Sequence, residues 1–152
     1  MNQDFRDILT CLLDAGARFL IVGAHALAVH GVPRATGDLD IWIDASSENA
    51  DKVWTALVTF GAPVEAMGVT RSDLLRPAMV VQLGVAPRRI DLLTAVSGVT
   101  FAEAWPDRVV HAVGDLRLPF LGRAALVANK RAAGRLQDLA DLEALGETAE
   151  GP

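Results

Sequence analysis

The chain has 152 residues, of which 51% are hydrophobic and 22% are charged, with a formal net charge of −5. This composition excludes a disordered chain, and the acidic balance argues against a protein that coats nucleic acid electrostatically. The only cysteine, Cys11, excludes an internal disulfide and a cysteine-based zinc site. No apolar run reaches about 18 residues and the first ten residues do not read as a signal peptide, so we expect a cytoplasmic protein without a membrane partner.

The first half of the chain reads as helices that alternate with strands. Apolar residues at helical spacing predict a helix over residues 3–15, and a buried strand follows at 18–23. A brief helix is expected at 24–31, a strand at 35–44, and a helix at 46–61 that begins at a serine cap and ends at Gly61.

The second half begins with two strand-like segments, 78–85 and 88–95, which are expected to form an antiparallel hairpin. A helical turn is expected at 101–105, short strands around Gly114 and Asp115, and two helices between residues 123 and 145 that meet near Gly134. This order predicts one α/β (α+β) domain over residues 1–146, a mixed sheet flanked by helices, and a frayed tail at 147–152.

Asp38 and Asp40 are one residue apart on the predicted strand at 35–44. Side chains alternate across a strand, so the even-numbered positions share one face if the extended stretch starts early. The shared face then carries Arg34, Thr36, Asp38, Asp40, Trp42 and Asp44, although we expect Trp42 to fill the core. Neighbouring carboxylates repel each other, and a hard cation such as Mg²⁺ would remove that repulsion.

A third acid, Asp91, interrupts the apolar run of the predicted strand at 88–95. If this strand lies beside residues 38–44, the three carboxylates converge on a site that can hold two metal ions about 4 Å apart. The alternative is a half-exposed strand whose acids are surface charges, and it predicts no gain in thermal stability from cations.

Gly23 ends a predicted strand and leads into a helix, where backbone amides can bind a phosphate that approaches without meeting a Cβ. Arg34 and Thr36 precede the aspartates on the presumed site face. Arg34 is expected to contact a phosphate or the acceptor, or to neutralise Asp38.

Residues 116–137 contain five basic residues and no acid, whereas residues 138–152 contain five acids and no base. A local cationic patch in an acidic protein suits one phosphorylated ligand. Lys130 and Arg135 are candidates because a break at Gly134 would let both reach inward, while the alternative is a solvated basic face. Asp138 is interpreted as structural, with support of Lys130 or Arg135 as the alternative.

The segment VGAHALAVHGVPRATGDLDIWID, residues 22–44, resembles the signature of the DNA polymerase β-type nucleotidyltransferase superfamily: an apolar residue, glycine, glycine or serine, then an Asp-x-Asp strand. Residues 88–105 resemble the segment with the third carboxylate of that family. Residues 126–145 resemble the C-terminal helices of small bacterial members, including those related to toxin–antitoxin nucleotidyltransferases.

This resemblance implies a nucleotidyltransferase that uses Mg²⁺, or Mn²⁺, and an NTP. Asp38, Asp40 and Asp91 would be the metal ligands, and Asp91 also the base toward the acceptor hydroxyl. Gly23 and its neighbour, Ala24, would hold the nucleotide phosphates. Lys130 would contact the triphosphate.

One residue departs from the family pattern, because Ala24 stands where glycine or serine is usual and offers only its backbone N–H. This leaves open a non-catalytic nucleotide-binding or interaction module with the same fold. The acceptor is also open among a tRNA end, a protein and a small molecule. For a chain of this size, a second copy in a homodimer or an antitoxin-like partner protein is expected to supply the acceptor surface.

Overall fold

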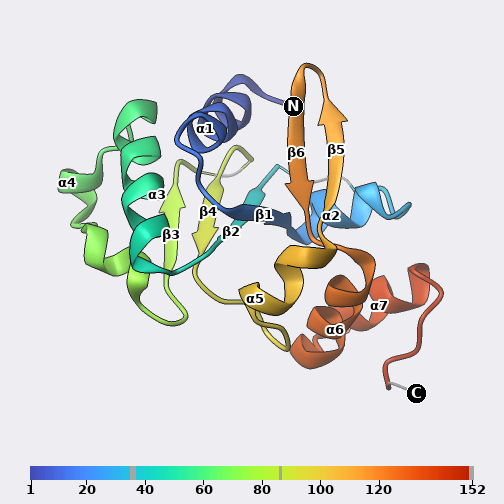
Figure 1. Ribbon diagram of the computed structural model, residues 1–152. Helices are drawn as coiled ribbons and strands as arrows, with labels where there is room; N and C mark the ends of the chain where they lie inside the picture. Colours follow the sequence, from blue (N-terminus) through green and yellow to red (C-terminus); the bar gives the residue numbers. More distant parts are fainter. Residues whose placement is uncertain (35–36, 86, 151–152) are drawn as a thin grey trace. The chain divides into compact units, whose positions relative to one another are not determined.

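The computed structural model describes residues 1–34, 37–85 and 87–150 (Figure 1). The chain divides into two compact units, each assembled from segments far apart in sequence. Unit 1 comprises residues 1–19 and 37–95, and unit 2 comprises residues 20–36 and 96–152. Among the described residues, no helix combines the length and the apolar character needed to cross a membrane.

Unit 1 holds three strands in mixed pairing, together with helices. Strand β4 pairs in parallel with β2 and antiparallel with β3. Helices α1 and α3 pack together and bury apolar side chains of both. The elements are α1 (Gln3–Asp14), β2 (Leu39–Ile43), α3 (Ser47–Phe60), α4 (Val64–Met67), the 3₁₀ helix η1 (Arg71–Leu75), β3 (Val80–Leu83) and β4 (Ile90–Leu93).

Unit 2 also holds three strands in mixed pairing, in which β6 pairs in parallel with β1 and antiparallel with β5. Helices α6 and α7 pack on each other. The elements are β1 (Phe19–Val22, whose first residue belongs to unit 1), α2 (Gly23–Val29), α5 (Phe101–Ala104), the 3₁₀ helix η2 (Trp105–Asp107), β5 (Val109–Val113), β6 (Leu116–Phe120), α6 (Arg123–Ala133) and α7 (Leu136–Ala144).

The start of α3 is held by a buried amide. Asn49, 3% exposed, accepts a 2.7 Å hydrogen bond from the backbone N–H of Arg18 and donates to the carbonyl oxygens of Arg18 and Asp44. Ser46 caps the helix by accepting from the N–H of Asn49 at 3.3 Å. These bonds join the end of β2 to α3 and to the segment after α1, and so fix β2 within unit 1.

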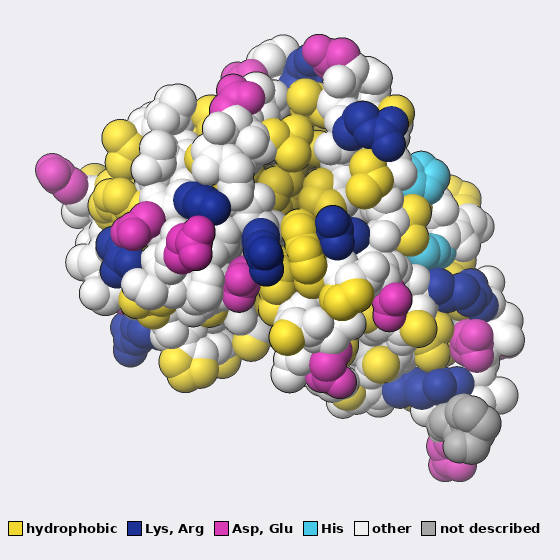
Figure 2. Space-filling model, in the orientation of Figure 1, with side chains coloured by type: hydrophobic (Ala, Val, Ile, Leu, Met, Phe, Trp, Pro, Cys, Tyr) yellow, Lys and Arg dark blue, Asp and Glu magenta, His cyan; other side chains and the backbone are white. Residues whose placement is uncertain are grey.

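The outer face of α3 carries charges of both signs. Figure 2 shows acidic and basic side chains interspersed over this helix. Arg71 of η1 forms an ion pair with Asp51, and Lys52 pairs with Glu48 at 3.5 Å. Alternating charges of this kind are typical of a solvated helix face and give a polyanion no continuous positive track.

The predicted fold class, a mixed α+β fold with mixed sheet and flanking helices, is confirmed. The antiparallel pairing of the two strands that contain residues 80–83 and 90–93 is confirmed as well. Trp42 is 1% exposed and fills the core as expected. The short helices α4 and η1 were not anticipated, because residues 62–75 show no sustained apolar period.

Candidate functional site

The three carboxylates singled out from the sequence all belong to unit 1. Asp40 of β2 lies directly opposite Asp91 of β4 in the parallel pairing, so their side chains emerge from the same face of the sheet. Asp38 is two residues before Asp40 and is placed on this face by the alternation of an extended chain. We call these three residues the acidic face. Tertiary structure thus brings together Asp91 and an Asp-x-Asp pair about 50 positions earlier.

Strand β2 begins at Leu39, later than the sequence indicates. The prediction that side-chain alternation extends back to position 34 therefore fails. Arg34 belongs to unit 2 and pairs with Asp141 of α7. Thr36, the other residue expected on this face, lies outside the described residues. The reason is tertiary: the ion pair with a buried carboxylate of α7 determines the position of Arg34.

Arg89 accompanies the acidic face and was not recognised in the sequence. Its Nη2 lies 3.2 Å from Oδ2 of Asp38, and its Nε lies 3.1 Å from Oδ1 of Asp91. The carbonyl oxygen of Arg89 accepts a 2.9 Å hydrogen bond from the N–H of Leu39. One signal could have revealed it, since Arg89 precedes Asp91 by two residues and so shares its face in an extended chain.

A close approach of two loops supports this arrangement. A Cβ on Gly37 would overlap the carbonyl oxygen and side chain of Pro87. Only glycine therefore lets the chain before Asp38 pass the chain before Arg89 at this distance. The contact sets the backbone on both sides of the Asp38–Arg89 ion pair.

The environment of the acidic face shifts the pKa of Asp40. Burial raises its pKa from 3.8 to about 6, with further raising by the charges of Asp91 and Asp38 and by a hydrogen bond with Asp91. The guanidinium of Arg89 opposes this shift and lowers the pKa. Burial is the largest of these effects, and the lowering by Arg89 does not cancel it.

The donor set of the acidic face fits a hard divalent cation in its chemistry, because carboxylate oxygens are the ligands that Mg²⁺ prefers. Oδ1 of Asp91 is buried and forms the ion pair with Nε of Arg89, but within the described part of the chain this contact does not have the geometry of a hydrogen bond. In residues 1–34, 37–85 and 87–150, however, no group of three or more His, Cys, Asp or Glu side chains is arranged to hold a metal ion. The guanidinium of Arg89 lies against two of the three carboxylates instead.

The residues expected to bind phosphate lie in unit 2. Gly23 has φ +67, a left-handed conformation that other residues adopt only with strain. Ala24 follows it in the first turn of α2. The requirement for glycine at this strand–helix junction is therefore explained by backbone conformation.

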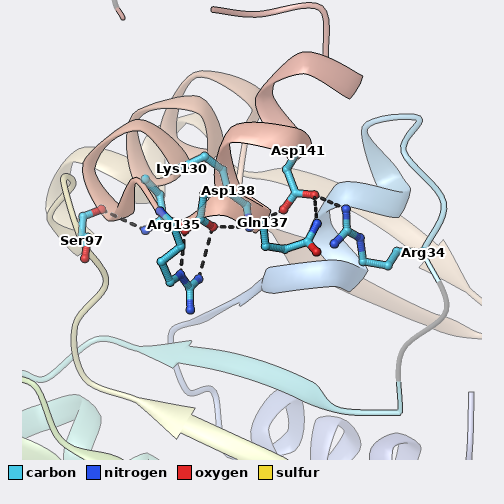
Figure 3. A network of polar contacts seen from close by, with 8 residues as sticks. Arg34, Ser97, Lys130, Arg135, Gln137, Asp138 and Asp141 are labelled. Atoms are coloured by element: carbon cyan, nitrogen blue, oxygen red, sulfur yellow. Dashed lines mark hydrogen bonds and ion pairs between the residues drawn. The ribbon is translucent and has the colours of Figure 1, made fainter. Parts of the chain in front are cut away.

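Lys130 is buried in α6 and engages two carboxylates of α7 (Figure 3). Its Nζ lies 3.2 Å from Oδ1 of Asp138 and 3.0 Å from Oδ2 of Asp141. The two aspartates are 0% and 1% exposed. Because a buried charge needs partners, this triad holds α6 and α7 together. A solvated basic face, the alternative weighed for Lys130, is wrong for this residue.

Asp138 also caps α7. Its Oδ2 accepts hydrogen bonds from the backbone N–H of Arg135 at 3.1 Å and from Nε of Arg135 at 2.7 Å. Burial alone would raise the pKa of Asp138, but hydrogen bonds from Arg135 and Lys130 outweigh it and hold that pKa below its usual value. Both expected roles of Asp138, structure and support of the two cations, are present.

Asp141 gathers a second set of donors. Besides Lys130, it binds the guanidinium of Arg34 and accepts a 3.0 Å hydrogen bond from Nε2 of Gln137 (Figure 3). The side chain of Arg34 remains 29% exposed. Gly134, at φ +62, separates α6 from α7 and so lets Lys130 and the residues of α7 meet.

The charge blocks of the C-terminal region neutralise each other. Arg123 pairs with Glu147 at 3.1 Å, and Arg131 pairs with the same carboxylate at 3.5 Å. With Lys130 and Arg135 bound to Asp138, four of the five basic residues in 116–137 pair with acids that follow them. The block predicted to form a cationic patch is therefore largely compensated.

Comparison with known proteins bears on the fold. No family model matches the chain, and no curated protein matches it in sequence. Among solved structures, it resembles one described as a "putative nucleotidyltransferase" from Thermotoga maritima, with a TM-score of 0.58 and 15% sequence identity. The match covers 93% of this chain and 88% of the other. At this identity the likeness shows a shared fold, which is the fold that the Asp-x-Asp signature predicted.

Proposed function

We propose that the protein is a Mg²⁺-dependent nucleotidyltransferase, with Mn²⁺ as the alternative ion, that moves an NMP from an NTP to an acceptor hydroxyl and releases pyrophosphate. The observation that carries the proposal is the register of β2 and β4, which sets Asp40 opposite Asp91 with Asp38 on the same face. The fold shared with the Thermotoga maritima protein supports it at the level of enzyme class.

In this proposal the acidic face holds the cation and receives a proton. The acceptor oxygen forms a bond to the α-phosphorus of the NTP, the bond from that phosphorus to the pyrophosphate oxygen breaks, and the hydroxyl proton passes to Asp91. Asp38 and Asp40 would hold the cation. A divalent cation bound there would neutralise charge that develops on the transferred phosphoryl group.

Unit 2 would bind the nucleotide. The backbone N–H groups of Gly23 and Ala24 would donate to phosphate oxygens, as peptide amides do in many phosphate sites. The side chain of Arg34 is partly exposed and pairs with Asp141, whereas Lys130 is enclosed by two carboxylates. Lys130, Arg135 and Thr36 complete the set assigned to the triphosphate, and contact with Lys130 would require it to exchange a partner.

A non-catalytic module that binds a nucleotide or a partner protein is the second candidate. Two observations favour it: Ala24 lacks a hydroxyl for the phosphate, and Lys130 already satisfies two buried carboxylates. This candidate predicts nucleotide binding without pyrophosphate release.

The deciding experiment incubates the purified protein with each labelled NTP, Mg²⁺ and total cell extract, and identifies the labelled fraction. Label in RNA, protein or small molecules would identify the acceptor among the three classes left open. The variant Asp38→Asn is expected to abolish labelling, whereas Asp44→Asn, the same change beyond the other end of β2, is expected to retain it. Labelling that persists in Asp38→Asn would contradict the assigned site.

The partner is tested on the same samples. Small nucleotidyltransferases of the toxin–antitoxin type suggest either a second copy of the chain or an antitoxin-like protein. Light scattering of the purified protein distinguishes a homodimer from a monomer. Co-purification of a labelled acceptor with a second polypeptide would instead favour a heteromeric partner.

A further inference from the structure

We propose that Arg89 is the resident counterion of the acidic face, and that a divalent cation binds there only as Arg89 releases Asp38 and Asp91. This inference rests on the proposed function. It adds a residue that sets the affinity for the cation, and it explains why the described residues present no ready group of three metal ligands.

The contacts of Arg89 show the competition. Its guanidinium reaches carboxylate oxygens on two strands of the acidic face, Oδ2 of Asp38 and Oδ1 of Asp91, at 3.2 and 3.1 Å. These are oxygens that a cation shared by both residues would use. Because a guanidinium and a divalent cation cannot occupy the same space between them, binding of one excludes these contacts of the other.

Differences in exposure determine which group moves. The side chain of Asp91 is 10% exposed, while that of Arg89 is 35% exposed. The acid is enclosed in the sheet, whereas the arginine has a path to solvent. Displacement of Arg89 therefore moves a side chain that already reaches solvent and leaves the enclosed carboxylate of Asp91 in place.

The backbone near Arg89 is held in place. Leu39 donates to the carbonyl oxygen of Arg89 at 2.9 Å, and Ile90, the next residue, is 2% exposed in β4. Gly37 passes close to Pro87 on the other side. The guanidinium is thus presented to the acids from a fixed point, so it acts at a high effective concentration.

The competition is one of charge. The guanidinium of an arginine stays charged throughout the pH range of proteins, so a divalent cation must compete with a full positive charge for these carboxylates. Replacing the guanidinium by an uncharged amide removes one positive charge from beside the cation. Affinity for a divalent ion should then rise by about tenfold or more, equivalent to about 1.4 kcal/mol.

The experiment is a calorimetric titration of the full chain with Mn²⁺ alone and with Mg²⁺ alone. The variants are Arg89→Gln and the control Arg88→Gln, which makes the same change one residue earlier, at an exposed side chain. We expect cation affinity to rise at least tenfold in Arg89→Gln and to stay within twofold of wild type in Arg88→Gln. Arg89→Lys keeps the charge, but its single ammonium group cannot contact Asp38 and Asp91 in the way the guanidinium does, so it should give an intermediate cation affinity. This variant tests the inference if Arg89→Gln does not fold.

Three other outcomes would contradict the role of Arg89, and one of them would also contradict the metal site. Equal or weaker cation binding in Arg89→Gln than in wild type would overturn the inference while leaving the metal site and the proposed function standing. An equal rise in Arg88→Gln would overturn it too, because the effect would then be one of overall charge. An absence of cation binding in wild type and in every Arg89 variant would overturn the inference together with the metal-dependent function.

Discussion

The perturbation that tests the acidic face most directly is Asp40→Asn. The native pKa of Asp40 is about 6, against 3.8 for an ordinary aspartate. Between pH 3.8 and about pH 6 the folded state binds more protons at Asp40 than the unfolded state does. The free energy of unfolding therefore falls as the pH rises through this range. The shift is about two pKa units at about 1.4 kcal/mol each, which gives a cost of about 3 kcal/mol above pH 7.

The asparagine variant removes this titration and keeps the shape of the side chain. We therefore expect its stability relative to wild type to increase from pH 4 upward, to reach about half of the full gain near pH 5, and to level off near 3 kcal/mol at pH 7. Asp44→Asn, outside the acidic face, should show no comparable increase.

Urea unfolding followed by tryptophan fluorescence measures this difference, because Trp42 is buried on β2 two residues from Asp40. The series should run from pH 4 to pH 8 in buffers with a chelator, so that trace cations do not neutralise the acids. A stability difference between Asp40→Asn and wild type that is constant across this range would refute the reasoning, since the native carboxyl would then carry no electrostatic penalty.

Three further outcomes are expected. Lys130→Met removes the cation that two buried carboxylates share and leaves each of them with one arginine partner, so it should lower the free energy of unfolding by about 3 kcal/mol. Lys52→Met on the solvated face should change it by less than about 0.5 kcal/mol, both measured by chemical denaturation. Gly37→Ala should cost about 1–3 kcal/mol in the same assay because its Cβ would overlap Pro87. Mg²⁺ should raise the Tm of wild type more at pH 8 than at pH 5, and this rise should disappear in Asp38→Asn.

The C-terminal region shows how the structure changes the interpretation of a charge pattern. The sequence displays a basic block followed by an acidic block, and read alone the basic block indicates an anion-binding patch. In the folded chain Lys130 lies between Asp138 and Asp141, and Arg123 and Arg131 meet Glu147. The break between α6 and α7 at Gly134 lets the basic block meet the acidic block, so that their charges neutralise each other.

Local patterns in the sequence determined most of the helices and strands, the glycine at position 23, and the placement of Asp38 and Asp40 on one face, but they gave neither α4 nor η1 and placed the start of β2 too early. These features depend on residues within a few positions of one another, through helical period, strand alternation and backbone sterics. The pairing of Asp40 with Asp91, the position of Arg89 between two carboxylates, and the burial of Lys130 were decided only by tertiary structure. Strand register and desolvation arise from contacts between distant segments, and no local pattern records which distant charge will meet which.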